Sequence, residues 1–569
     1  MEYLYFGFAC LIFVLAVIGR GIYLDRKKAA EFEKSLRRDY GKLPKREISP
    51  ERFLRMDRYF RKHPEKDQID DITWNDLGMD EIFRGMNHTY SAIGEEYFYY
   101  TLRSPGHTME QLEGLESLIG FFSKQEDLRV SVQKDMAKLG YMGKYSLYDY
   151  LDHLDYLGER SNRNAYLRNA LFFLFLVLMP FSFSLGLIGM LVILIVNNLI
   201  YFREKGEIEP YIISFVYILR LVECAEKLEK VEKQEDVQKN KAVQRVFLEI
   251  SEAQKALSPL KKGSFWVLAG NGSLGGDPAG MLMDYIKMAF HIDLISFNRM
   301  LSFVRSHAAE VDRLCSALGY LETSIAIGAY RKSLQDREGY AVPFLLEDPK
   351  AQLVLEAGYH PMLTEPVLNS ISASKGVLIT GSNASGKSTF LKTVAINSIF
   401  AQTIHTCTAK QYQAPCFRIF SSMALRDDLQ GGESYYIVEI KALQRILTAA
   451  KEEGRPVLCF VDEVLRGTNT VERIAASTQI LRSLATKNTL CFAATHDIEL
   501  TELLEEEFSN YHFTEEIAEG DISFPYQLLK GRATTRNAIR LLEIIGYDRD
   551  IIETAEKLAE KFVREGVWT

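Results

Sequence analysis

A glycine-rich stretch beginning at residue 381 has the residue types and spacing needed to hold phosphate groups. Gly381, Gly386, Lys387 and Ser388 fit the pattern G-x-x-x-x-G-K-[ST]. Glycines let such a loop wrap so that backbone N–H groups face phosphate oxygens, and the lysine reaches the β- and γ-phosphates. The pattern predicts a nucleotide-binding loop made of Gly381, Ser382, Asn383, Ala384, Ser385, Gly386, Lys387, Ser388 and Thr389.

Two adjacent acids that follow another apolar run complete this chemistry. The run Val457–Val461 leads directly into Asp462 and Glu463. Asp462, with the Ser388 hydroxyl, suits Mg²⁺ binding, and Glu463 suits a general base that polarises the attacking water. The alternative interpretation is a pair of solvated acids capping a strand. The upstream phosphate-binding loop argues against it.

A histidine and a serine extend the predicted site. His496 follows a third apolar run, 490–494, and can hydrogen-bond the γ-phosphate and sense its loss. Ser434 ends a Gly-rich turn, 427–434, which resembles the segment that ABC-type ATPases present to the γ-phosphate of a partner subunit. The predicted catalytic residues are Lys387, Glu463 and His496.

The helices and strands that must position these residues can be predicted from the local pattern of apolar and polar residues. Short β-rich runs at 376–380, 457–461 and 490–494 are separated by helical segments, which predicts an α/β domain with a mostly parallel sheet. Residues 50–160 and 203–345 show helical patterns and few strand signals. Within them, a charged segment at 219–257 has apolar residues at three- and four-residue spacing, which favours an extended lever helix or a short coiled coil.

Two apolar runs predict contact with a membrane. Tyr3–Gly19 carries no charge and is about as short as a bilayer-spanning helix can be, with basic residues following it. Ala170–Phe202 has no charge over 33 residues, with proline, glycine and serine near its middle. Basic residues flank both of its ends. This pattern favours a re-entrant or two-span hairpin over a single tilted span. The basic residues that follow Tyr3–Gly19 place the N-terminus outside and the rest of the soluble chain in the cytosol.

Composition sets further bounds. The net charge of −8 gives no support to a globally basic nucleic-acid binder. The seven cysteines are scattered without a C-x-x-C pair, so we expect reduced thiols and no metal cluster. The segment from Arg20 to Lys62 holds fifteen basic and seven acidic residues. It is either a helix lying on anionic lipid heads or a solvated juxtamembrane helix.

Five ordered motifs resemble those of the MutS family. The loop 380–389, including Asn383, is similar to the MutS phosphate-binding loop, and Val461–Thr470 to its D-E-x-x-R-G-T-x-T. The other three matches are His360-Pro361, the segment Asp427-Asp-Leu429 with Ser434 and Glu439, and Ala494-Thr-His496. Upstream, residues 78–105 are similar to the start of the MutS helical core. Residues 526–562 resemble the helices through which the family dimerises.

The resemblance implies a homodimeric, ATP-hydrolysing clamp that uses ATP and Mg²⁺. Lys387, Ser388, Asp462, Glu463 and His496 would come from one subunit and Ser434 from the other. The chain departs from the family in its membrane runs and in lacking room for the mismatch-reading domain. An ABC transporter half is a poor alternative, because the interval from the phosphate-binding loop to the Gly-rich turn leaves no space for a transporter's inserted helical subdomain.

The predicted fold is an α/β P-loop NTPase domain of ABC/MutS type plus an all-α MutS-core-like domain with transmembrane helices. The predicted divisions are a transmembrane anchor at 1–20, a basic juxtamembrane segment at 21–69, helical core at 70–168, a transmembrane hairpin at 169–203, core and lever helices at 204–345, the ATPase domain at 346–525 and dimerising helices at 526–569.

Two functions fit this organisation. The first is a clamp tethered to the cell membrane, multi-pass, with its ATPase domain in the cytoplasm and with DNA as its ligand. The second is a membrane-tethered ATPase switch that grips a protein or envelope partner. A measurement of DNA binding at increasing salt distinguishes the two functions, because an affinity that depends on phosphate contacts falls steeply as the salt concentration rises.

Overall fold

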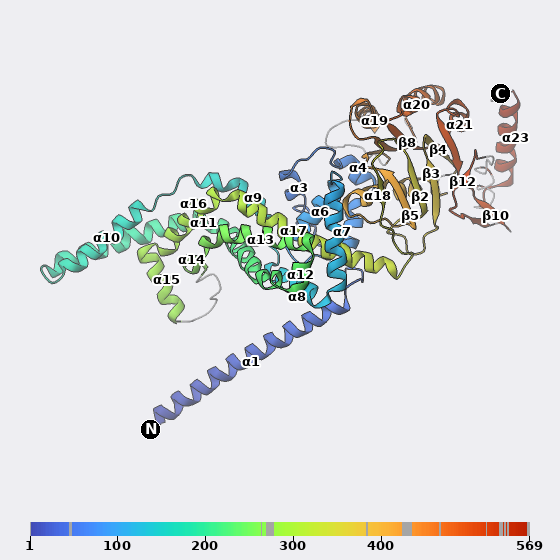
Figure 1. Cartoon of the computed structure of the whole chain (residues 1–569). Helices are drawn as coiled ribbons and strands as arrows, with labels where there is room; N and C mark the ends of the chain where they lie inside the picture. The colour runs from blue at the N-terminus through green and yellow to red at the C-terminus, as the bar shows by residue number, and fades with distance from the viewer. Residues whose placement is uncertain are drawn as a thin grey trace. The chain divides into compact units, whose positions relative to one another are not determined.

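The chain forms two units in the computed structural model (Figure 1). The first, helical unit groups Met1–Pro64, Asn87–Tyr100 and Gly114–Tyr330, and the second groups Glu65–Met86, Thr101–Glu113 and Arg331–Thr569. The structure describes residues 2–44, 48–262, 264–268, 278–382, 385–423, 435–465, 468–518, 521–533, 539, 542 and 546–565.

The first unit is built from helices, three of which (α6, α7 and α17) continue into the second unit. They are α1 (Glu2–Arg38), α2 (Pro50–Phe53), α3 (Arg58–Lys62), α6 (Ala92–Arg103), α7 (Met109–Lys124), α8 (Glu126–Leu139), α9 (Leu147–His153), α10 (Arg163–Leu178), α11 (Phe183–Glu232), α12 (Glu235–Lys239), α13 (Lys241–Leu257), α14 (Ser264–Leu268), α15 (Pro278–Phe290), α16 (Ile292–Ser306) and α17 (Ala308–Gln335). The helical prediction for this part of the chain is confirmed.

The predicted lever at 219–257 is folded back on itself. α11 ends at Glu232, and Asn240 caps α13 by accepting hydrogen bonds from the Ala242 and Val243 backbone N–H groups. α13 then packs along α11, and an ion pair joins Lys261 to Glu226. An extended lever is therefore wrong, because the apolar positions of α11 and α13 bury one another in a shared core.

The apolar run 170–202 forms a helical hairpin. α10 ends at Leu178 and α11 begins at Phe183, so the turn contains Pro180 and Ser182 of the predicted cluster, whereas Gly186 and Gly189 lie in the first turns of α11. Among the described residues, α11 alone has the length and hydropathy of a membrane-spanning helix. α11 also continues past the apolar run as a core helix of the first unit, with Pro210 inside it.

The second unit contains a six-stranded sheet, a four-stranded sheet and a small hairpin. Their strands are β1 (Phe344–Leu346), β2 (Leu353–Gly358), β3 (Asn369–Ala373), β4 (Gly376–Thr380), β5 (Gln411–Pro415), β6 (Arg418–Ser422), β7 (Val457–Asp462), β8 (Thr489–Ala494), β9 (Phe508–His512), β10 (Glu516–Ala518), β11 (Asp521–Ser523) and β12 (Leu529–Lys530). Its helices are α4 (Asp71–Asp76), α5 (Met79–Met86), α18 (Lys387–Thr403), α19 (Tyr435–Lys451), α20 (Thr470–Leu484), α21 (Glu499–Leu503) and α23 (Arg549–Glu565).

The six-stranded sheet has the order β12-β9-β4-β8-β7-β6. All its neighbours pair in parallel except β12 with β9. α18 packs between this sheet and the four-stranded sheet of order β1-β5-β2-β3, whereas α19, α20 and α21 cover the opposite face (Figure 1). The mostly parallel α/β prediction is confirmed. The sheet is buried on both faces, which is why its strands read as continuous apolar runs.

The C-terminal part begins differently from the prediction. Tyr526 lies in an irregular stretch between β11 and β12, with a left-handed φ of 54°. The last described helix, α23, covers Arg549–Glu565 and presents Ile551 and Leu558 as exposed side chains on one face. The helical pattern expected from residue 526 onward therefore starts later.

The predicted divisions place residues 65–69 in the juxtamembrane segment and residues 70–86 in the helical core, but the structure groups Glu65–Met86 with the α/β unit. The buried Asp76 carboxylate accepts hydrogen bonds from the Ser421 hydroxyl (2.6 Å) and the Met423 backbone N–H (2.9 Å) at the end of β6. The Thr73 hydroxyl accepts one from the Ser421 N–H, and Arg445 of α19 forms an ion pair with Asp70. α4 thus covers the exposed edge of β6.

Replacing Asp76 with alanine is expected to loosen this edge. The change leaves the Ser421 hydroxyl and the Met423 N–H without their acceptor, at a cost of about 1–3 kcal/mol each. Hydrogen exchange at the Ser421 and Met423 amides should speed up correspondingly. Glu81→Ala, which removes an exposed acid from α5, is the matched control. Unchanged exchange in the Asp76 variant would remove its role in holding β6.

Candidate nucleotide site

Three neighbouring parallel strands deliver the predicted residues to one edge of the sheet. β8 lies between β4 and β7, and Ala494 at its end pairs with Ile379 of β4 and Asp462 of β7. The ladder continues one residue further, where the Glu463 N–H donates to the Ala494 carbonyl (2.9 Å). The carboxyl ends of parallel strands form the usual ligand crevice of such sheets, and the sequence-predicted residues gather there.

The phosphate-binding loop leaves β4 in a conformation that requires glycine. Gly381 has φ of 142°, and a Cβ there would lie 2.8 Å from the Phe513 carbonyl oxygen. Gly386, with φ of 103°, directly precedes the first residue of α18. The buried Lys387 ammonium donates to the carbonyls of Gly381 and Ser382, both at 2.8 Å. Lys387 therefore lies folded over the loop at the N-terminus of a 17-residue helix, where anions are favoured.

The two predicted metal ligands meet directly. The Ser388 hydroxyl donates to Oδ2 of Asp462 at 2.5 Å. Ser388 comes from the first turn of α18 and Asp462 from the last position of β7. A hydroxyl and a carboxylate together are oxygen ligands of the type that Mg²⁺ prefers.

Glu463 and His496 form a second contact beside them. Nε2 of His496 lies 2.8 Å from Oε1 of Glu463 and 3.3 Å from the Lys387 Nζ. One nitrogen cannot donate to the carboxylate and accept from the ammonium at once, and the shorter distance favours donation to Glu463. Glu463 also has a left-handed φ of 55°, a backbone conformation that non-glycine residues adopt rarely and that clusters at functional sites.

Two side chains outside the predicted set support this pair. Arg473 of α20 forms a bidentate ion pair with Asp497, the residue after His496, at 2.6 and 2.9 Å. The buried Glu439 of α19 accepts a hydrogen bond from the Leu465 N–H, two residues after Glu463. Glu439 matched a motif in the sequence without an assigned role, whereas nothing in the sequence singled out Arg473.

A cavity of about 410 Å³ adjoins the phosphate-binding loop. Its walls include His360 and Phe513 together with Tyr526, whose ring lies 3.1 Å from where a Cβ on Gly386 would be. Burial, and then the charge of Lys392, lower the pKa of His360 to about 4, so its imidazole is neutral at neutral pH. An aromatic wall with a neutral histidine suits a flat heterocycle next to the phosphate loop. No pattern in the sequence pointed to Phe513 or Tyr526.

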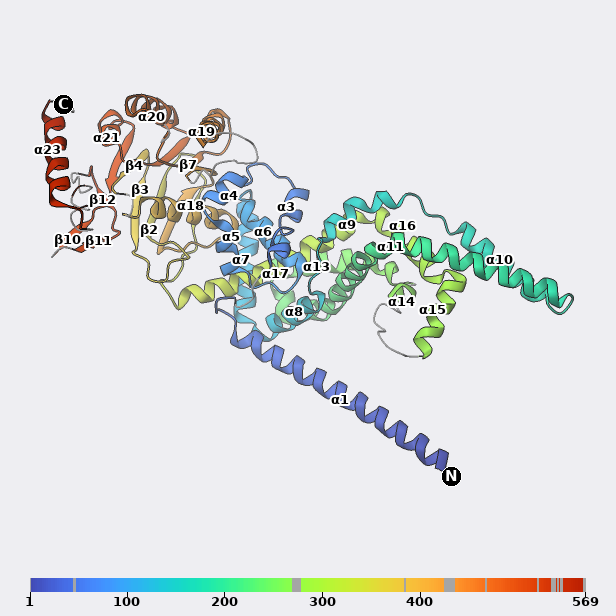
Figure 2. The ribbon, with the colours of Figure 1, turned by 180° about the vertical axis from the view of Figure 1, so that it is seen from behind.

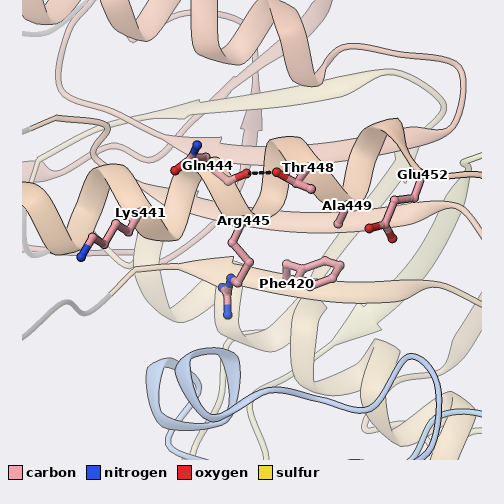
Figure 3. A pocket seen from close by; sticks show the side chains of 7 residues that line it. All are labelled: Phe420, Lys441, Gln444, Arg445, Thr448, Ala449 and Glu452. Carbon is pink, nitrogen blue, oxygen red and sulfur yellow. Dashed lines mark hydrogen bonds between the residues drawn. The ribbon is translucent and has the colours of Figure 1, made fainter.

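A second cavity, of about 450 Å³, is lined by residues of α19 and by Phe420 of the neighbouring strand β6 (Figure 3). Arg445 lines it, with its guanidinium 5.5 Å from the centre of the Phe420 ring and a hydrogen bond to the Ser421 carbonyl. No residue of the phosphate-binding loop lines this cavity. Of its lining residues, Arg445 also forms the ion pair with Asp70 at the start of α4.

Some predicted residues lie outside the described part of the chain. These are Asn383 and Ala384 of the loop and Ser434 of the Gly-rich turn. Of the remaining loop residues, Ser385 is buried, and Ser388 and Thr389 are exposed and line the 410 Å³ cavity. Within the described ranges, no group of three or more histidine, cysteine or acidic side chains gathers as a metal cluster.

The donor set fits a nucleotide with Mg²⁺. The positive end of α18 and the Lys387 ammonium suit phosphates, the Ser388–Asp462 pair suits a hard divalent cation, and the adjoining cavity has room for a base.

Comparison with known proteins agrees with the motifs. The model of the MutS domain V family matches residues 377–563. The chain is 32% identical over 237 residues to the DNA mismatch repair protein MutS of Thermus thermophilus, a match that covers 40% of this chain and 28% of that protein. Similar matches reach the MutS proteins of Thermus aquaticus (32% over 222 residues; 38% and 27%) and Natronomonas pharaonis (32% over 263 residues; 44% and 28%).

The chain thus spans less than a third of the length of these relatives, and the family model ends a few residues before the last residue. The matched region contains the phosphate-binding loop, the Asp462–Glu463 pair and His496. Residues 377–563 of the chain are therefore similar to domain V of the MutS family.

Proposed function

We propose that the chain is a membrane-anchored ATPase of MutS type that works as a homodimeric clamp on DNA. The observation that carries the ATPase is the convergence of Lys387, the Ser388–Asp462 pair and the Glu463–His496 pair at one sheet edge. The relatives' printed names, DNA mismatch repair protein, motivate DNA as the ligand.

Each residue has a role that follows from its position. Lys387 would leave the Gly381 and Ser382 carbonyls and bind phosphate oxygens instead. Ser388 and Asp462 would hold Mg²⁺, which when bound neutralises charge on the phosphates. Glu463 would accept the proton of the attacking water, and His496, already hydrogen-bonded to Glu463, would contact the γ-phosphate.

A dimer would complete the site. Ser434 would reach the γ-phosphate of the partner subunit. The exposed Ile551 and Leu558 on one face of α23 offer an apolar stripe for pairing of C-terminal helices. The proposed location is the cell membrane, with α1 and the α10–α11 hairpin as anchors and the ATPase domain in the cytoplasm.

DNA binding is tested by its salt dependence. The detergent-solubilised chain is expected to bind duplex DNA at low salt with ATP or ADP present, and to release it steeply as salt rises, because phosphate contacts release counterions. Fluorescence anisotropy of labelled DNA measures this. Absence of binding at low salt in both nucleotide states would exclude DNA as the ligand while leaving the ATPase intact.

One observation favours a protein partner instead. The segment 219–257, which forms the end of α11 together with α12 and α13, holds eight basic and eight acidic residues. Several are paired with each other along the helices, as in Lys233 with Glu229 and Lys239 with Glu235. Such a balanced surface provides no positive face for a phosphate backbone. Crosslinking in native membranes, followed by identification of the captured molecule, separates a protein partner from DNA.

A further inference from the structure

The α10–α11 hairpin carries an apolar surface that the described part of the chain covers only near its base, where Phe290 of α15 stacks on the Phe173 ring. Phe173, Val177, Ile188 and Ile195 are all more than half exposed. The two arms lie side by side and project from the helices of the first unit in both views (Figures 1 and 2). So large a contiguous apolar surface marks an interaction site, and lipid is the partner that an uncharged apolar helix pair fits.

The arms form one rigid rod. A Cβ on Gly186 would lie 2.6 Å from Cγ of Met179 and 2.8 Å from the Phe175 carbonyl oxygen, and Gly189 is packed as tightly against the Phe175 ring. Small residues that allow helices to approach this closely are typical of helix pairs packed in lipid.

A polar cluster closes the base of the hairpin. We call Arg168, Asn197 and His291 the collar. Arg168 donates to the Asn197 side-chain oxygen (3.0 Å) and to Nδ1 of His291 (3.1 Å), while Nε2 of His291 donates to the Asn197 carbonyl (2.8 Å). Asn197 and His291 are almost wholly buried.

Charged groups continue from the collar away from the tip. Lys205 and Tyr201 both hydrogen-bond the buried Asp293 carboxylate, and Arg203 is 85% exposed. Charged and polar side chains of this kind are costly inside the hydrocarbon core of a bilayer. They are expected at its boundary, where they pair with one another. The collar therefore marks the level at which α10 leaves the lipid, while the exposed Leu199 and Phe202 carry the apolar surface of α11 further, to Arg203.

The distance from the collar to the tip is too short for a crossing. At about 1.5 Å per residue, α10 rises about 15 Å from Arg168 to Leu178, and α11 about 21 Å from Asn197 back to Phe183. The hydrocarbon core of a bilayer is about 30 Å thick. A hairpin whose base stays at one boundary thus ends inside the bilayer.

The tip itself is apolar. The turn at 179–182 carries no charge, and Phe181 and Phe183 are 85% and 65% exposed. A turn emerging on the far side would place these rings in water, whereas a turn inside the bilayer buries them. Burial of these side chains stabilises the inserted state.

We propose that the α10–α11 hairpin is a re-entrant wedge that enters the bilayer from the side of the collar and ends within it without crossing. The inference rests on the proposed membrane location but on neither ATP hydrolysis nor DNA binding. Under this inference, both ends of the hairpin and the rest of the first unit lie on the same side of the membrane because the hairpin turns back inside the bilayer, and not because it crosses the bilayer twice.

Two variants, each with one added accessible cysteine, test the wedge in the full chain. Cys10 and Cys416 are replaced by serine in both, and the other native cysteines are buried. Phe181→Cys places a bimane fluorophore at the tip, and Arg203→Cys places the same group beyond the collar. Both proteins are reconstituted into vesicles of phosphatidylcholine and phosphatidylglycerol that contain spin-labelled lipids, and intact cells are treated with a membrane-impermeant maleimide.

If the hairpin is a wedge, spin labels deep in the acyl chains should quench the probe at residue 181 most strongly and leave the probe at residue 203 largely unquenched. The external maleimide should not modify the thiol introduced at residue 181. Modification of that thiol from outside would show a crossing and overturn the inference. Membrane-bound protein without lipid quenching at residue 181 would also overturn it while leaving an anchor through α1. Protein absent from the membrane fraction would overturn the anchoring proposal itself.

Discussion

Replacing Glu463 with glutamine is expected to slow ATP hydrolysis by about 10²–10⁴-fold while leaving ATP bound, because a positioned general base contributes on that order. Glutamine keeps the shape of the side chain, which is mostly buried beside His496, but it cannot accept the proton of water. The ATP-bound dimer should then persist, since hydrolysis is what would open it. Phosphate release measures the first effect, and the mass of the detergent-solubilised particle with ATP measures the second.

Glu453→Gln is the matched control for this experiment. Glu453 is exposed in the turn between α19 and β7 of the same unit, so the same chemical change there should leave turnover unaffected. A Glu463→Gln protein that hydrolyses ATP at the normal rate would remove Glu463 from the catalytic role. A protein that loses turnover but forms no ATP-dependent dimer would instead contradict the composite site.

Replacing Lys387 with methionine is expected to weaken ATP binding by about ten- to a hundredfold. The loss of a charged hydrogen-bonding group costs about 1.5–3 kcal/mol, which corresponds to that change in affinity. Methionine is unbranched and only one heavy atom shorter than lysine, so the loop and the start of α18 should stay in place. Titration with a fluorescent ATP analogue provides the measurement.

Lys350→Met is the control, because Lys350 is 80% exposed in the same unit and lies outside the cavity walls. It should bind ATP as the parent protein does. Equal affinity in the Lys387 and Lys350 variants would mean that the loop binds phosphate through its backbone alone, or that the nucleotide lies elsewhere.

Most of the site could be predicted from the sequence because its signals are local. Each strand is a short apolar run, and each functional residue lies at the carboxyl end of a strand or in the segment that follows it. The parallel order of β4, β8 and β7 therefore suffices to bring Lys387, Asp462 and His496 together. Local patterns carry no information about contacts between distant segments. Tyr526 reaches Gly386 from 140 positions later in the chain, and it lies in an irregular stretch that has no periodicity to detect.

The same limit explains the two differences in the helical part. Periodicity identified helix over 219–257, but whether α13 continues α11 or folds back depends on the break at Lys233 and on the shared core. Residues 65–86 read as ordinary amphipathic helix. Only the hydrogen bonds of Asp76 with Ser421 and Met423 reveal that this segment covers the edge of β6.

The uninterrupted course of α11 bears on how the protein is made. The core of the first unit contains residues from both sides of the hairpin, such as Phe122 and Leu139 before it and Phe215 and Val222 after it. For a chain inserted as proposed, the ribosome delivers the first half of this core before the hairpin and the second half after it. The core can therefore close only after the hairpin has been synthesised, and because α11 runs without a break from the hairpin into the core, hairpin insertion and core closure involve one and the same helix.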